Sequence, residues 1–154
     1  MMKKIIFSIL TAALLTTGCS SNSVNTQVSK QDLASQQVLN ELKNGVAIYF
    51  DRNSSQVEEK YHPYLTAAAQ GLAQNSQFIL ELEGHTDSTG SVAGNKRVSL
   101  ERANAVRNKL VLDYNVNPDQ IRTLGAGSAK PIDSNATAEG RANNRRVSAT
   151  LKIQ

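Results

Sequence analysis

The sequence predicts an α+β fold, a two-layer sandwich with helices on one face of a mixed four-stranded sheet. Two observations support this prediction. Alternating apolar residues, typical of half-buried strands, occur over 46–50, 78–83, 121–126 and 147–153. Segments with helical periodicity or helix-start signals separate them, so the order is strand, helix, strand, helix, strand, short helix, strand.

Residues 1–18 are expected to be a secretory signal peptide rather than part of the fold. Lys3 and Lys4 precede an apolar run over 5–15 that is too short to span a bilayer. Cys19 follows the leader and is the only cysteine of the chain, so an exported product has no internal disulfide to form. The free thiol therefore needs another explanation.

Residues 19–44 are expected to form a tether. The segment 20–30 is rich in Ser, Asn, Thr and Gln and has no apolar period. A capping signal and a following glycine predict a short helix over 31–44, but its apolar residues form no clean stripe, so partial order is expected. Fully extended, the 26 residues of the tether would span roughly 85 Å, an upper bound that any helix shortens.

The domain is expected over 45–154, beginning with a strand and a turn. Ser55-x-x-Glu58 offers a capping box for a first helical turn. Because Pro63 cannot lie inside a long helix, the main helix is predicted to begin near His62, with Pro63 in its first turn. The inward positions of this helix are Leu65, Ala68 and Leu72.

A second long helix is predicted after the strand at 78–83. Its apolar stripe at i, i+4, i+7 and i+11 suits packing on a sheet and consists of Ser99, Ala103, Val106 and Leu110. Asn95 and Arg102 are seven residues apart, so they share one flank of the stripe, two turns or roughly 10.5 Å apart along the axis. Arg102 is therefore expected at the margin of the core, facing the turn that carries Asp87.

This strand-to-helix turn is the candidate binding site, because ligands of such units gather where strand-end side chains converge. Asp87 and Arg102, held near each other, suit a zwitterion: the carboxylate takes an ammonium and the guanidinium takes a carboxylate. A structural ion pair between the two is the alternative that spacing leaves open. Arg145 precedes the last strand, and its side chain is expected to lie near that of Arg102. Two converging guanidiniums favour an anion between them. The alternative is that these arginines are loop residues exposed to solvent.

Several function classes find no support in the residues. His85 and Asp87 would supply two metal ligands where a catalytic zinc site needs three, so neither a metal nor a cofactor is expected. Gly125 and Gly127 lack the third glycine of a phosphate loop, and close packing or turning is expected instead. No nucleophile motif occurs, so the chain is not expected to be an enzyme. The net charge of +4 includes two lysines of the leader, and aromatic content is 5%, so nucleic acid is not an expected partner.

Four ordered motifs connect the site to the rest of the domain. They are Thr86-Asp87-x-x-Gly90, Asn95-x-x-Val98-Ser99-x-x-Arg102, Gly125-x-Gly127-x-x-x-Pro131 and Gly140-Arg141-x-x-Asn144-Arg145-Arg146-Val147. Together they resemble the OmpA C-terminal-like domain, the peptidoglycan-binding module also found in peptidoglycan-associated lipoprotein and in flagellar stator proteins. The resemblance covers about residues 46–153. Val98, where Leu is commoner, and Arg52-Asn53, in a variable segment, depart from the pattern.

The resemblance implies a ligand and a set of site residues. In the family, residues matching Asp87 and Arg102 hold diaminopimelate of the peptidoglycan stem peptide, whose free D-centre is a zwitterion. Asp87 would then take its ammonium and Arg102 its carboxylate. The further positions that line this pocket in the family correspond here to Phe50, Asp51, Asn53, Thr86, Asn95 and Arg145.

The end of the leader resembles a bacterial lipobox, which implies that Cys19 is the lipid-modified first residue of the mature protein. Thr16 stands where Leu is usual, a departure from the pattern. Ser20, rather than Asp, implies sorting to the outer membrane, where several acyl chains would hold the protein firmly on the periplasmic face.

The expected function is therefore a non-covalent clamp between the outer membrane and the cell wall. An envelope protein-interaction adaptor of the Tol-Pal type, with wall binding secondary, is one alternative. A wall hydrolase is another, although it would need a metal set or a nucleophile with its base.

Overall fold

The computed structural model describes residues 30–154, with side chains from residue 37 onward. The predicted signal peptide, Cys19 and the first part of the tether lie outside these residues. Four strands form one sheet in the order β1-β4-β2-β3. They are β1 (Val46–Tyr49), β2 (Phe78–His85), β3 (Ile121–Gly127) and β4 (Arg146–Ile153). Because β4 pairs antiparallel with β1 and β2 while β2 pairs parallel with β3, the predicted mixed sheet is confirmed.

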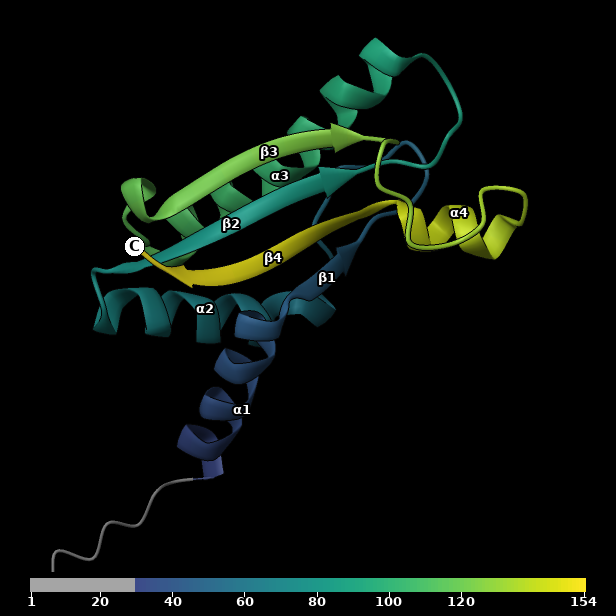
Figure 1. The fold of residues 1–154 in the computed structure, drawn as a ribbon. Helices are drawn as coiled ribbons and strands as arrows, with labels where there is room; N and C mark the ends of the chain where they lie inside the picture. The colour runs from purple at the N-terminus through teal and green to yellow at the C-terminus, as the bar shows by residue number, and fades with distance from the viewer. Residues whose placement is uncertain (1–29) are drawn as a thin grey trace, which may run out of the picture.

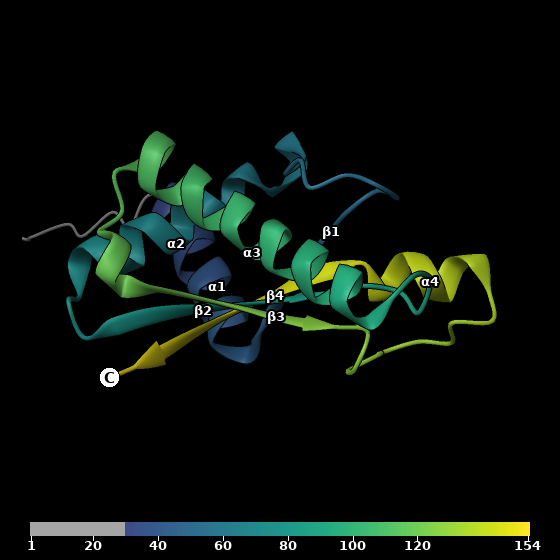
Figure 2. The same ribbon diagram turned by 90° about the horizontal axis from the view of Figure 1, so that it is seen from above.

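The helices are α1 (Lys30–Asn44), α2 (His62–Gln74), α3 (Val92–Tyr114) and α4 (Ala138–Asn144). Figure 1 shows α4 beyond the end of the sheet at which β2 and β3 terminate. Helices α2 and α3 cover the same face of the sheet (Figure 2), which confirms the predicted two-layer α+β sandwich. Within residues 30–154, no helix is both long and apolar enough to cross a bilayer.

The core lies between α2, α3 and the sheet. The predicted stripe of α3 is fully buried: Ser99, Ala103, Val106 and Leu110 each have 0% of their surface exposed. The predicted inward positions of α2 are buried as well. They pack with alternate strand residues that include Leu80, Leu82, Val147, Ala149 and Leu151. Both periodicity predictions are confirmed.

The segment before α2 differs in part from expectation. A 3-10 turn over Glu59–Tyr61 precedes the helix and Pro63 occupies its first turn, as predicted. The capping box at Ser55 was wrong, because Glu58 is extended and its side chain makes no capping hydrogen bond. The carbonyl of Ser54 instead accepts a hydrogen bond from Arg102 Nε at 3.0 Å, which ties this segment to α3 rather than to a helix of its own.

Two glycines allow α3 to lie directly on the ends of β2 and β3. A Cβ atom on Gly84 would lie 1.8 Å from the carbonyl oxygen of Ser99, and one on Gly125 would lie 2.7 Å from that of Lys96. No other residue permits such an approach. The expectation of close packing at Gly125 is confirmed, and the approach brings the first half of α3 to the candidate site.

Helix α1 is continuous over 15 residues, although only partial order was expected. Leu42 has 2% of its surface exposed and belongs to the core, while Val38 and Leu39 pack against the core. These three positions do form a stripe, at i, i+1 and i+4. The tip of Leu39 lies so close to Gly71 of α2 that a Cβ there would be 2.5 Å from its Cδ2. The last part of the predicted tether therefore packs on the domain.

Candidate binding site

A cleft of about 510 Å³ lies at the end of the sheet where β1 and β2 lead into their turns. The turn after β1, the turn after β2, the start of α3 and the residue before β4 all contribute to it. Its lining consists of Arg52, Asn53, Ser54, Ser55, Thr86, Asp87, Thr89, Gly90, Asn95, Val98, Glu101, Arg102 and Arg145. The predicted site residues Asp87, Arg102, Asn95, Thr86, Asn53 and Arg145 are all among them.

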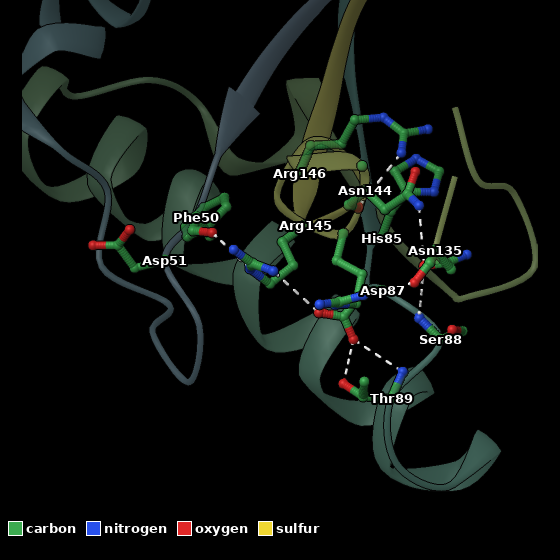
Figure 3. A network of polar contacts seen from close by, with 12 residues as sticks. Phe50, Asp51, His85, Asp87, Ser88, Thr89, Asn135, Asn144, Arg145 and Arg146 are labelled. Atoms are coloured by element: carbon green, nitrogen blue, oxygen red, sulfur yellow. Dashed lines mark hydrogen bonds and ion pairs between the residues drawn. The ribbon is translucent and has the colours of Figure 1, made fainter. Parts of the chain in front are cut away.

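Asp87 is held by three hydrogen bonds from two neighbours (Figure 3). Its Oδ1 accepts from the Thr89 backbone N–H at 2.9 Å and from the Thr89 hydroxyl, and its Oδ2 accepts from Arg145 Nη1 at 3.2 Å. Burial acts to raise the pKa of Asp87, but the bonds from Thr89 and Arg145 outweigh it and lower the pKa below its ordinary value. The group is therefore an oriented carboxylate at neutral pH.

Arg102 is buried and makes three hydrogen bonds to backbone carbonyls. Nε donates to Ser54 at 3.0 Å, Nη1 to His85 at 3.3 Å and Nη2 to Asp51 at 3.1 Å. Since a guanidinium carries five N–H groups, one on each Nη is left for a ligand. Burial and then the charge of Arg145 lower the pKa of Arg102, while Asp87 opposes the shift. In the described part of the chain, no ion pair joins Arg102 to Asp87, so the structural pair weighed as an alternative is not formed.

Arg145 is fixed by the end of β1. Phe50 N–H donates to the carbonyl of Arg145 at 2.9 Å, and Arg145 Nε donates to the carbonyl of Phe50 at 3.3 Å. The guanidinium thereby reaches Asp87 and lies in the same cleft as Arg102. The cleft thus brings together the guanidiniums of Arg102 and Arg145 and the carboxylate that Arg145 binds.

Two polar residues complete the wall beside Asp87. Asn95 is 8% exposed and its Nδ2 donates to the carbonyl of Asp87 at 3.4 Å. The backbone N–H of Thr86 donates to Gly127 at 2.9 Å, but its buried hydroxyl has no hydrogen-bond partner among the described residues. A buried hydroxyl without a partner in a cleft is available to a ligand.

Two of the predicted site residues do not line the cleft. Phe50 is 3% exposed and lies beneath Arg102, whose guanidinium carbon is 5.4 Å from the ring centroid. Asp51 contributes its backbone carbonyl to Arg102, while its side chain is exposed and lies apart from the Asp87–Arg145 pair (Figure 3). Both therefore support the site from outside its lining.

Sequence reasoning missed Thr89 and the asparagines that hold the turn. Asn144 is completely buried; its Nδ2 donates to Asn135 Oδ1 at 3.1 Å, and that oxygen also accepts from the Ser88 N–H at 3.0 Å. These bonds join the loop before α4 to the turn of Asp87 (Figure 3). For Thr89, the Asp-x-Thr spacing was an available signal, because side chains two residues apart bond locally in such turns. The Asn135 contact spans 47 residues and left no local signal.

His85 does not share the site with Asp87. Its side chain is 1% exposed, its Nε2 lies 3.4 Å from Ser148 Oγ, and it lines no part of the cleft. Burial, assisted by the charge of Arg146, lowers the pKa of His85 to about 4. Among the side chains that the structure describes, no three of His, Cys, Asp or Glu gather as a metal site would require.

Comparison with known proteins gives a consistent family match. The OmpA family matches residues 49–145. Outer membrane protein Omp38 of Acinetobacter baumannii is 40% identical over 116 residues, which are 75% of this chain and 33% of that protein. This chain thus corresponds to about a third of Omp38. A peptidoglycan-associated lipoprotein of Buchnera aphidicola is 36% identical over 95% of this chain and 96% of its own length. The crystal structure of the peptidoglycan-associated lipoprotein from Burkholderia pseudomallei superposes with a TM-score of 0.66 at 30% identity, covering 69% of this chain and 89% of that one.

Proposed function

The chain belongs to the OmpA family, and we propose that it binds peptidoglycan non-covalently through the cleft at Asp87 and Arg102. The observation that carries the proposal is the placement of the oriented carboxylate of Asp87 and the guanidiniums of Arg102 and Arg145 in a single cleft. The similarity to proteins named peptidoglycan-associated lipoprotein supports the choice of ligand.

The ligand that fits these groups is the D-centre of diaminopimelate, which carries an ammonium and a carboxylate on one carbon. Asp87 binds the ammonium through the Oδ2 lone pair that Arg145 leaves free, because Thr89 occupies both lone pairs of Oδ1. The two spare N–H groups of Arg102 bind the carboxylate, and the unpartnered hydroxyl of Thr86 supplies a further hydrogen bond. The contacts of Arg102 with backbone carbonyls fix its guanidinium in advance, which lowers the entropic cost of binding.

We further propose that Cys19 carries lipid and anchors the protein in the outer membrane, with residues 1–18 removed as a signal peptide. Helix α1 changes the reach of the predicted tether, because its 15 residues rise only roughly 22 Å and its end packs on the domain. The segment 19–29 would then set the distance between the membrane and the start of α1, at most roughly 40 Å when extended. The domain acts as a clamp and cuts no bond.

Co-sedimentation with purified sacculi of the diaminopimelate type tests the proposed function. The domain, residues 20–154, is incubated as wild type, Asp87→Ala, Arg102→Ala and Arg122→Gln, and each variant is checked for folding by circular dichroism. Arg122 is exposed on the sheet face without helices and serves as the matched control. Wild type and the control are expected to pellet, and the two site variants are expected to stay in solution.

Each other outcome has a defined meaning. Equal pelleting of all four proteins would show wall binding at another site. If all are folded and none pellets, wall binding is contradicted and the adaptor function becomes the better account. Release of soluble muropeptides by the purified protein would contradict a purely binding role.

A further inference from the structure

A second lobe adjoins the cleft on the side of α4. It has a volume of about 340 Å³ and is lined by Arg52, Asp87, Thr89, Ala138, Arg141 and Arg145. Four of these six side chains also line the main cleft. A peptide seated in the cleft can therefore extend a neighbouring group into the lobe.

The lobe carries an excess of positive charge. Three guanidiniums line it, from Arg52, Arg141 and Arg145, and the only acidic side chain among its lining residues is Asp87. Converging cations raise each other's energy unless an anion lies between them. The charge of the lobe thus favours an anionic group of the ligand.

Two of the three guanidiniums already have protein partners. Arg145 bonds to Asp87, and Arg141 Nη1 donates to the carbonyls of Asn135 and Ala136 at 2.9 and 3.0 Å. For Arg52, no hydrogen bond or ion pair is formed with any other residue of the described chain. All five of its N–H donors are therefore open to an anion.

The backbone that carries Arg52 is held in place. Asn53 has φ of 59°, in the left-handed region, and Ser54 N–H closes the turn on the carbonyl of Asp51 at 3.2 Å. Buried Arg102 donates to both Asp51 and Ser54 at 3.1 and 3.0 Å. The residue that would grip the diaminopimelate thus also fixes the turn that presents Arg52 between cleft and lobe.

Building on the proposed function, we propose that Arg52 binds a second carboxylate of the same stem peptide while the D-centre occupies the cleft. Besides the D-centre, a tetrapeptide stem carries two free carboxylates, on its terminal D-Ala and on the α-carbon of D-Glu. Both offer the same chemistry to a guanidinium. Arg52 is accordingly a specificity-determining residue that distinguishes stem peptides by the free carboxylate next to diaminopimelate.

Isothermal titration calorimetry with defined peptides tests this role. Full-length protein in detergent is titrated with the tetrapeptide L-Ala-γ-D-Glu-diaminopimelate-D-Ala, with its terminal amide and with its D-Glu amide. Wild type, Arg52→Gln and the matched control Arg122→Gln are compared. One of the two amidated peptides is expected to bind wild type and control about fivefold more weakly than the unmodified peptide. This factor corresponds to the free energy of a partly exposed ion pair. Arg52→Gln should bind the unmodified peptide about fivefold more weakly and should not distinguish it from that amide.

The carboxylate whose amidation weakens binding is the one that Arg52 binds. Equal affinity of wild type for all three peptides would overturn the inference, as would unchanged discrimination by Arg52→Gln. These results leave the proposed function intact, because the unmodified tetrapeptide still binds. Failure of wild type to bind any of the peptides would instead overturn the proposed function and this inference together.

Discussion

Arg145 Nη1 lies 3.2 Å from Asp87 Oδ2, so the carboxylate of the candidate site is paired with the arginine that precedes β4 and not with Arg102 on α3. Arg102 is directed to three backbone carbonyls instead. The two guanidiniums therefore have different tasks. Arg145 joins Thr89 in orienting Asp87 and lowering its pKa, while Arg102 holds the turn after β1 and retains two N–H groups for a ligand.

Arg145→Gln is expected to raise the pKa of Asp87. The hydrogen bond and positive charge of Arg145 both favour the ionised carboxylate, and their loss leaves burial less opposed. The pKa is followed by the ¹³C shift of the Asp87 carboxyl carbon as pH is lowered. Arg145→Lys retains the charge and should give a smaller rise. An unchanged pKa in Arg145→Gln would show that Thr89 alone sets it.

Arg102→Lys is expected to weaken wall binding nearly as much as Arg102→Ala. A single ammonium cannot reach the carbonyls of Asp51, Ser54 and His85 together, and it lacks the planar fork for a carboxylate. The same change should lower the free energy of unfolding by about 2 kcal/mol, because buried carbonyls lose their donors. Urea denaturation and sacculus pelleting measure the two effects, with Arg122→Lys as control. Wild-type binding by Arg102→Lys would contradict the proposed carboxylate grip.

His85→Gln is expected to flatten the dependence of stability on pH. The pKa of His85 is about 4 in the folded protein, against 6.5 ordinarily, since burial and Arg146 disfavour the charged ring. Below pH 6.5 the unfolded chain binds more protons than the folded one, so stability falls as pH falls toward the folded pKa. Between pH 6.5 and 5 this loss amounts to about 2 kcal/mol. Urea denaturation measures the free energy of unfolding of wild type and His85→Gln over this pH range. Equal slopes of this free energy against pH for the two proteins would contradict the account.

Leu42→Ala is expected to lower the free energy of unfolding by about 2 to 4 kcal/mol, because it leaves a cavity in the core. Leu42 is 2% exposed, whereas Leu112 on α3 is 75% exposed and provides a matched control that should change little. Thermal or urea unfolding of the chain from residue 20 gives both values. A loss below about 0.5 kcal/mol for Leu42→Ala would mean that α1 contributes nothing to the folded domain.

Elements with a strong local pattern were predictable from the sequence. The stripe from Ser99 to Leu110 follows from helical periodicity alone, and Pro63 marks the start of α2 because its ring excludes a helix interior. The capping box at Ser55 was wrong since a tertiary hydrogen bond from Arg102 ties the neighbouring Ser54 to α3. Local propensity is a weak prior against such contacts.

Six of the eight predicted site residues line the cleft, but the pairings between them could not be predicted from the sequence. Asp87 and Arg102 could be placed near one strand-to-helix turn because they are only 15 residues apart. The strand pattern before Asp87 and the helical pattern around Arg102 follow each other directly along the chain. The bond between Arg145 and Asp87 joins residues 58 apart, and it depends on how β4 pairs with β1 and β2. The burial of Phe50 under Arg102 likewise depends on the packing of α3, which no spacing along β1 encodes.

The most direct test of the central claim compares two stem peptides that differ in one carboxylate. A tripeptide ending in diaminopimelate and its analogue ending in lysine carry the same ammonium, but the lysine peptide lacks the D-centre carboxylate. Calorimetric titration of wild type is expected to show binding of the first peptide and at least about tenfold weaker binding of the second, as loss of a charge-assisted hydrogen-bond pair implies. Equal affinity for both peptides would contradict the claim that Asp87 and Arg102 grip the two ends of a zwitterion.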